Sequence, residues 1–106
     1  MFGRQVTLKL KSNAAPEFTR INEAEILPIL RKQKGFRDET TFVAPERSEA
    51  IANSFWDSEA DADAYSRATY PEVLKTLANV IEGTPMIKTF EFASSTFHKA
   101  NAAKIA

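Results

Sequence analysis

Alternating apolar and polar residues mark the first strand of the chain. Over residues 5–11, Val6, Leu8 and Leu10 fall on one side of an extended backbone, and polar residues fall on the other. A period of two is typical of a strand with one buried face. Similar runs predict further strands over residues 36–44, 49–56 and 86–93.

A helical period separates the first two of these strands. Phe18, Ile21, Ile26 and Ile29 recur at a spacing that places them broadly on one face of a helix. Pro28 lies inside this segment, where its ring clashes with the preceding turn. The pattern therefore predicts one helix with a kink at the proline.

A second helical segment follows the third strand. Ser58 can cap a helix that runs to Ala68, and Asp61 completes a capping-box pattern three residues later. Pro71 indicates that the helix breaks and restarts. The second piece carries an apolar stripe, formed by Val73, Leu74, Leu77, Val80 and Ile81.

The order of these elements, β-α-β-β-α-β, predicts the fold. It is typical of a ferredoxin-like α+β domain, a four-stranded antiparallel sheet with two helices on one face. Large apolar or aromatic residues occur on both faces of the later strands. A monomer would leave one such face bare, and a second copy of the chain is the simplest cover. We therefore expect a homodimer.

Composition narrows the class of protein. The 106 residues predict a single domain, with a core over about residues 4–95 and a polar tail over 96–106. Fourteen basic and fourteen acidic residues cancel, which favours neither nucleic acid nor an acidic membrane as a partner. The absence of cysteine excludes disulfides, thiolate zinc sites and cysteine nucleophiles. Without a signal sequence or an apolar run near the roughly 18 residues of a membrane span, we expect a cytoplasmic protein.

Candidate binding residues gather around the end of the third strand. Trp56 is either a ligand wall or a core residue, and the acidic residues after it fit helix capping. Ser54 shares its strand face, and two tyrosines follow in the helical segment. The candidates for a pocket are Trp56, Ser54, Tyr65, Tyr70, Phe42 and Phe18.

Other polar residues give weaker indications. Asp61 and Asp63 diverge on a helix and make a poor metal pair, so no metal site is expected. His98 could act as a general base, but its place in the polar tail favours a surface residue.

Three stretches of sequence resemble a known family. They are "GF" at 35–36, "FWDSEADADAY" at 55–65, which follows a W-x-S-x-x-x-x-x-x-[YW] pattern, and "TPMIKTFEF" at 84–92. Together they resemble the antibiotic-biosynthesis-monooxygenase (ABM) domain family of the dimeric α+β barrel superfamily. The resemblance covers about residues 4–95. It implies a homodimer whose two sheets form a barrel, with a pocket between sheet and helices in each subunit.

The residues that carry the known chemistries of that family are mostly different in this chain. Quinone-forming members carry an Asn and a Tyr where this chain has Ala52 and Ala62. Haem-degrading members carry an axial His where this chain has Lys75, so neither haem nor another cofactor is expected. Two hypotheses remain. One is a cofactor-independent monooxygenase acting on a small aromatic or hydrophobic substrate; the other is a non-catalytic dimeric domain for small-ligand binding or stress response.

Overall fold

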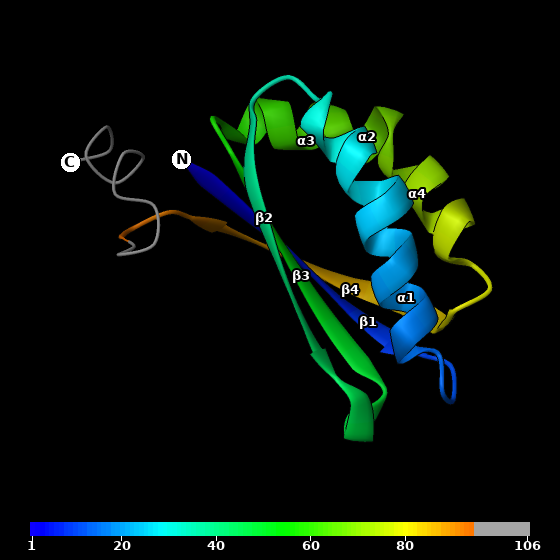
Figure 1. Ribbon diagram of the computed structural model, residues 1–106. Coiled ribbons are helices and arrows are strands. Elements are labelled where there is room, and N and C mark those ends of the chain that lie inside the picture. The colour runs from blue at the N-terminus through cyan, green and yellow to red at the C-terminus, as the bar shows by residue number, and fades with distance from the viewer. Residues whose placement is uncertain (95–106) are drawn as a thin grey trace.

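Four antiparallel strands form one twisted sheet in the order β2-β3-β1-β4 (Figure 1). The computed structural model describes residues 1–94. The strands are β1 (Phe2–Leu10), β2 (Phe36–Ala44), β3 (Glu49–Trp56) and β4 (Ile81–Glu91). The ferredoxin-like arrangement expected from the sequence is confirmed. Residues 95–106, which include His98 and the expected polar tail, lie outside the described residues.

Five helices of the described residues pack on one face of this sheet (Figure 1). They are α1 (Ala15–Ile21), η1 (Asn22–Ile26), α2 (Leu27–Arg31), α3 (Glu59–Ala68) and α4 (Tyr70–Leu77), and a short 3-10 helix, η2 (Pro45–Arg47), joins β2 to β3. The Ser58 hydroxyl accepts a hydrogen bond from the backbone N–H of Asp61 at 3.2 Å, which confirms the expected cap. Within residues 1–94, no helix is long and apolar enough to cross a membrane.

The first helical segment contains a π-helical turn, η1, which shifts its buried face by one residue. Ile29 was expected to face the sheet, but Leu30 is the buried residue and Ile29 is half-buried. In an uninterrupted α-helix, Ile29 would lie about 20° from Phe18 around the axis, and Leu30 about 120°. In η1 the N–H of Leu27 bonds to the carbonyl five residues back. This wider turn brings Leu30 onto the face that packs against the sheet. The turn lies just before Pro28, which has no N–H to continue the α-helical hydrogen bonds.

The last strand begins at Ile81 and not at Met86, so that part of the prediction is wrong. Helix α4 ends at Leu77, and Ile81 pairs with β1. Gly83 has a φ of 68°, and the pairing of β1 with β4 shifts register between Thr7 and Lys9. This irregularity is tolerated because β4 is an edge strand, where a glycine and a proline need not complete the ladder.

The two faces of the sheet differ sharply in burial. Trp56, Phe18 and Leu10 are fully buried between the sheet and the helices. On the opposite face no helix formed by residues 1–94 covers the sheet, and Phe42, Met86 and Phe90 are 62%, 63% and 51% exposed. An apolar surface of this kind is unusual for a protein that stays monomeric.

Candidate functional site

A cavity lies between the sheet and the helices. It has a volume of about 40 Å³ and is partly open to solvent. That is room for roughly three water molecules, so a larger ligand requires its walls to move. Its walls are mainly apolar, from Val6, Leu8, Phe18, Ile26, Leu30, Ala52, Val73 and Leu77. Six polar side chains also line it, those of Arg4, Asn22, Glu39, Ser54, Tyr65 and Tyr70.

Three of these polar residues form a row across the sheet. Glu39 on β2 pairs with Ser54 on β3, and Ser54 pairs with Arg4 on β1. Neighbouring strands lie about 4.8 Å apart, so the backbones of Glu39 and Arg4 are separated by about 10 Å. The sheet register therefore places a carboxyl group and a guanidinium cation at opposite ends of one cavity floor.

Arg4 is a buried cation with an incomplete set of partners. It is 4% exposed. Its Nε donates to Ser66 Oγ at 2.9 Å, and its Cζ lies 4.2 Å from the ring centroid of Tyr70 and 5.3 Å from that of Tyr65. Its Nη2 is buried and has no hydrogen-bond partner. Ring faces attract a cation but accept no conventional hydrogen bond, so this donor remains unsatisfied.

Ser54, at the centre of the row, is held by its neighbours. Its Oγ accepts a hydrogen bond from Trp56 Nε1 at 2.9 Å and donates to the backbone carbonyl of Arg4 at 3.4 Å. Trp56 also packs against Tyr65, with ring centroids 5.0 Å apart, and against Phe36 at 5.6 Å. The Ser54 hydroxyl is thus a fixed part of the floor and is not free to act as a nucleophile.

Glu39 occupies the acidic end of the cavity. The hydroxyl of Thr41 bonds to its two carboxyl oxygens at 2.7 and 2.6 Å, and Asn22 Nδ2 donates to Thr41 Oγ1 at 3.4 Å. Burial raises the pKa of Glu39, and the Thr41 hydrogen bond opposes this effect. A raised pKa makes the ionised carboxylate a stronger base than a solvent-exposed glutamate.

The two tyrosines remain protonated at neutral pH. Burial raises the pKa of Tyr65 to about 12, although the nearby Arg4 cation lowers it. Burial also raises the pKa of Tyr70, again against the influence of Arg4. The Tyr70 hydroxyl is buried and makes no hydrogen bond of standard geometry, although the Arg4 guanidinium lies near enough to lower the pKa of Tyr70 by hydrogen bonding as well as by its charge. Both side chains can therefore donate hydrogen bonds to a ligand but are poorly suited to accept a proton from one.

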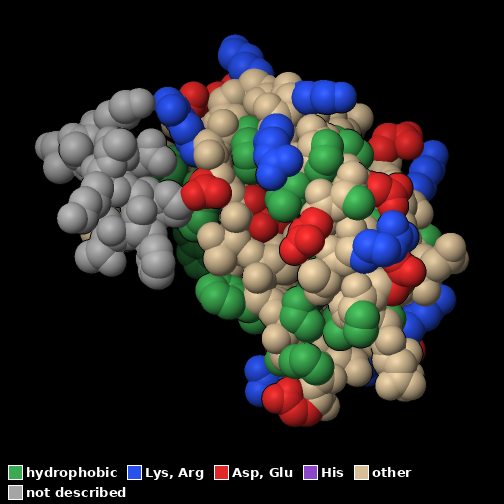
Figure 2. Space-filling model, in the orientation of Figure 1, with side chains coloured by type: hydrophobic (Ala, Val, Ile, Leu, Met, Phe, Trp, Pro, Cys, Tyr) green, Lys and Arg blue, Asp and Glu red, His purple; other side chains and the backbone are tan. Residues whose placement is uncertain are grey.

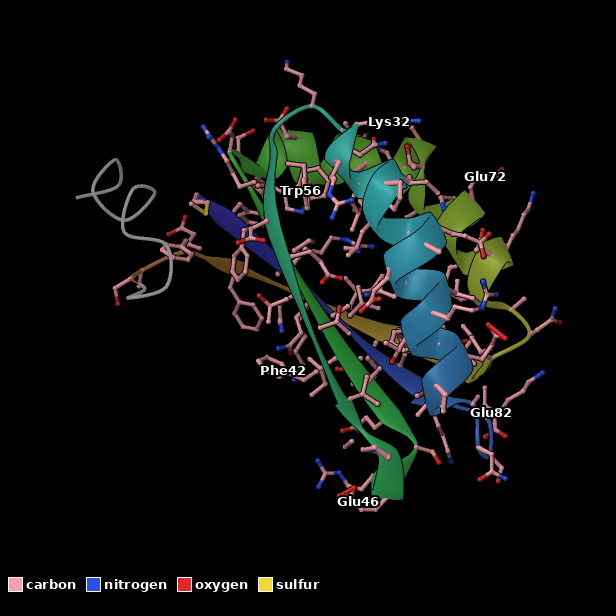
Figure 3. All side chains as sticks on the ribbon, viewed as in Figure 1. Lys32, Phe42, Glu46, Trp56, Glu72 and Glu82 are labelled. Atoms are coloured by element: carbon pink, nitrogen blue, oxygen red, sulfur yellow. The ribbon has the colours of Figure 1, made fainter. Side chains whose placement is uncertain are left out.

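The residues expected to form a pocket occupy three different environments. Phe18, Ser54, Tyr65 and Tyr70 line the cavity. Trp56 lies between the sheet and the helices (Figure 3) and does not line the cavity, but it contacts two residues that do, Ser54 and Tyr65. Phe42 differs from the prediction because it projects from the opposite side of the sheet, away from the helices (Figure 3).

The positions that the ABM resemblance singled out contribute little polar chemistry. Ala52 lines the cavity and Ala62 is buried. Lys75, at the position of a haem-ligating histidine, is exposed and forms an ion pair with Glu72 at 3.7 Å.

Arg4, Asn22 and Glu39 were not among the residues expected at the site. On β1, Arg4 lies between Phe2 and Val6 in the set of alternate residues that face the helices. Glu39 belongs to the corresponding set on β2. A charged residue at a position that alternation assigns to the core is the signal that could have found both.

Charges on the helix-covered face of the molecule give no comparable pattern. Over the face shown in Figure 2, basic and acidic side chains are mixed without a broad patch of one sign. In the described part of the chain, no group of three or more His, Asp or Glu side chains is placed to hold a metal ion. The arrangement of interest is therefore the polar row under the helices.

Comparison by sequence finds no match among known proteins. The sequence matches no protein-family model, and it matches no curated protein.

Solved structures, by contrast, match over most of the chain. A protein of unknown function from Nitrosomonas europaea has a TM-score of 0.74 and 18% identity, covering 90% of this chain and 91% of its own. A monooxygenase of Streptomyces coelicolor, solved with the ligand nanaomycin D, has a TM-score of 0.73 and 15% identity, covering 89% and 88%. A protein named an antibiotic biosynthesis monooxygenase has a TM-score of 0.70 and 10% identity, covering 89% and 100%. At these identities the similarity establishes the fold, and the chain has the ABM-like architecture that its sequence resemblance implied.

Proposed function

We propose that this chain is a cofactor-independent monooxygenase that binds a small aromatic hydroxy compound in the cavity and oxidises it with O₂. The observation that carries the proposal is a pair of buried donors without a hydrogen-bond partner, Arg4 Nη2 and Tyr70 Oη, in two residues that line an otherwise mainly apolar cavity. Apolar pockets with a few converging polar groups are the usual form of small-molecule sites. A ligand oxygen at the end of the molecule away from the reacting hydroxyl would satisfy both donors.

The chemistry requires a phenol to lose its proton before it reacts with O₂. Glu39 is the candidate proton acceptor, because it lines the cavity and burial raises its pKa. A ligand that fills the cavity would displace its water, and the apolar walls would then limit the contact of the resulting phenolate with solvent. For 1-naphthol, the overall reaction with one O₂ yields 1,4-naphthoquinone and one water, so it needs no external reductant.

An ¹⁸O₂ experiment tests the proposal. With 1-naphthol, the protein should form quinone carrying one labelled oxygen, faster than a protein-free control. The rate should rise with pH through the raised pKa of Glu39, because only the ionised carboxylate accepts a proton. Glu39→Gln should lower the rate by about 100-fold or more. Glu46→Gln, at an exposed residue in η2, makes the same charge change away from the cavity and should have no effect.

The alternative is a domain that binds such ligands without turnover. It is favoured by Ala52 and Ala62, which stand where quinone-forming members of the family carry polar residues. Binding of 1-naphthol without labelled product would support this alternative and overturn the oxidation chemistry.

We further infer that two copies of the chain pair through the open face of the sheet. Phe42 on β2 and Met86 on β4 belong to one cross-strand row, and Phe90 belongs to another, beside Phe55. Between them lies a polar row in which Gln5 Nε2 donates to Asn53 Oδ1 at 3.0 Å. A second copy would bury both apolar rows, as symmetric dimers commonly do.

Sedimentation velocity tests the pairing. The protein should sediment as a dimer at micromolar concentration, and Phe42→Glu should shift it toward monomer by placing a charge in the interface. Thr19→Glu, at an exposed position on α1, should leave the dimer intact. A folded wild-type monomer at micromolar concentration would contradict the inference.

A further inference from the structure

The unusual feature of the cavity is that its two opposite charges do not pair with each other. Arg4 and Glu39 belong to one row, but Ser54 lies between them. Among residues 1–94, no carboxylate lies within ion-pair distance of Arg4. A buried charge without an opposite charge normally costs folding free energy, which the faces of the two tyrosines and Ser66 offset only in part.

The free edge of Arg4 suits one class of ligand group. A guanidinium has a planar fork of donors that matches a carboxylate, and charge-assisted hydrogen bonds of this type are the strong ones. Nη2 is the donor left without a partner, and the Tyr70 hydroxyl, also without one, belongs to the ring that lies against the guanidinium. One carboxylate can therefore accept from both residues.

The opposite end of the cavity suits a different group. Glu39 accepts from Thr41, and an ionised carboxylate there would repel a ligand anion while accepting from a neutral hydroxyl. The backbones of Glu39 and Arg4 are about 10 Å apart across the row. The charged groups of both residues line the cavity from opposite ends of this row, so one aromatic ring with a carboxylate and a hydroxyl on opposite carbons can address both.

We propose that the ligand of this cavity is a small aromatic hydroxy acid, with its carboxylate on Arg4 and Tyr70 and its phenolic hydroxyl facing Glu39. The carboxylate subsite stands on the geometry of Arg4 and Tyr70 and does not depend on any oxidation, whereas the role of the phenolic end rests on the proposed function. The ring would lie against the apolar walls, which must move outward because the cavity is small.

A pair of nearly isosteric probes tests the carboxylate subsite. Calorimetry under argon at pH 7 compares 4-hydroxybenzoate with 4-hydroxybenzamide, which keeps the shape and loses the charge. The wild type should bind the acid at least about tenfold more tightly than the amide, since hydrogen bonds to charged groups are the stronger ones. Arg4→Met should abolish this preference, and Arg67→Met, at an exposed residue of α3, should retain it.

A second variant keeps the test decisive if Arg4→Met does not fold. Tyr70→Phe removes only the unpartnered hydroxyl and should weaken binding of the acid about threefold or more, with little effect on the amide. Equal affinity of the wild type for both probes, or no binding of either, would overturn the inference. So would a preference that persists in Arg4→Met.

The outcome is separable from that of the proposed function. Calorimetry under argon measures binding without oxidation, so a carboxylate preference without oxygen incorporation would refute the oxidation and leave the subsite standing. Oxidation of 1-naphthol without a carboxylate preference would refute the subsite alone.

Discussion

Replacing Trp56 with alanine should lower the free energy of unfolding by about 3–5 kcal/mol, as expected for a buried aromatic residue. Trp56 is 0% exposed and packs against Phe36 and Tyr65. The variant would also deprive the buried Ser54 hydroxyl of its donor. Urea denaturation followed by circular dichroism measures the change.

Trp56→Phe is the matched control for this substitution. It keeps most of the buried ring and removes the hydrogen bond to Ser54. The melting temperature should move little, while ligand affinity or turnover should fall because Ser54 lines the cavity. Unchanged binding of every ligand in Trp56→Phe would show that Trp56 serves only in packing.

Gly35→Ala should be the most destabilising glycine substitution in the described chain. Gly35 has a φ of 79°, which costs an L-residue roughly 1–2 kcal/mol. An added Cβ would also overlap the carboxyl group of Asp61 and lie 2.7 Å from its Cβ. Overpacking of this kind adds about 1–3 kcal/mol, measured as a loss of unfolding free energy.

Gly83→Ala separates the two contributions. Gly83 has a similar φ of 68°, but an added Cβ there would meet no atom within 4 Å. The Gly83→Ala variant should therefore lose only the backbone contribution, about 1–2 kcal/mol of unfolding free energy. Equal losses at the two glycines would show that the contact with Asp61 does not matter.

Most of the fold could be predicted because its signals are local. The alternation over β2 and β3 and the cap at Ser58 each depend on a few neighbouring residues, and their bounds agree with the structure. The start of β4 was wrong because a glycine and a proline resemble the end of a helix, although an edge strand accommodates both. The shift from Ile29 to Leu30 was wrong for another reason. A π-helical turn adds a residue without leaving any sequence pattern that a fixed helical period could detect.

The site was harder to predict, because its charged ends become apparent only when the strands are aligned. Tyr65 and Tyr70 were plausible as aromatic residues near Trp56. Arg4 and Glu39 are far apart in sequence, and the register of three strands places them in one row. Phe42 was named as a pocket candidate although it lies on the open face, because aromatic residues occur on both sides of this sheet.

The bond between Trp56 and Ser54 has a spectroscopic consequence. Trp56 is the only tryptophan of the chain, so its indole accounts for all the tryptophan fluorescence. Its Nε1 bonds to a hydroxyl on the cavity floor, and its ring lies beside Tyr65. A ligand that displaces either neighbour changes the polarity around the excited indole and the transfer of energy from tyrosine. The fold thus contains an intrinsic optical probe, one hydrogen bond away from the cavity, that requires no label.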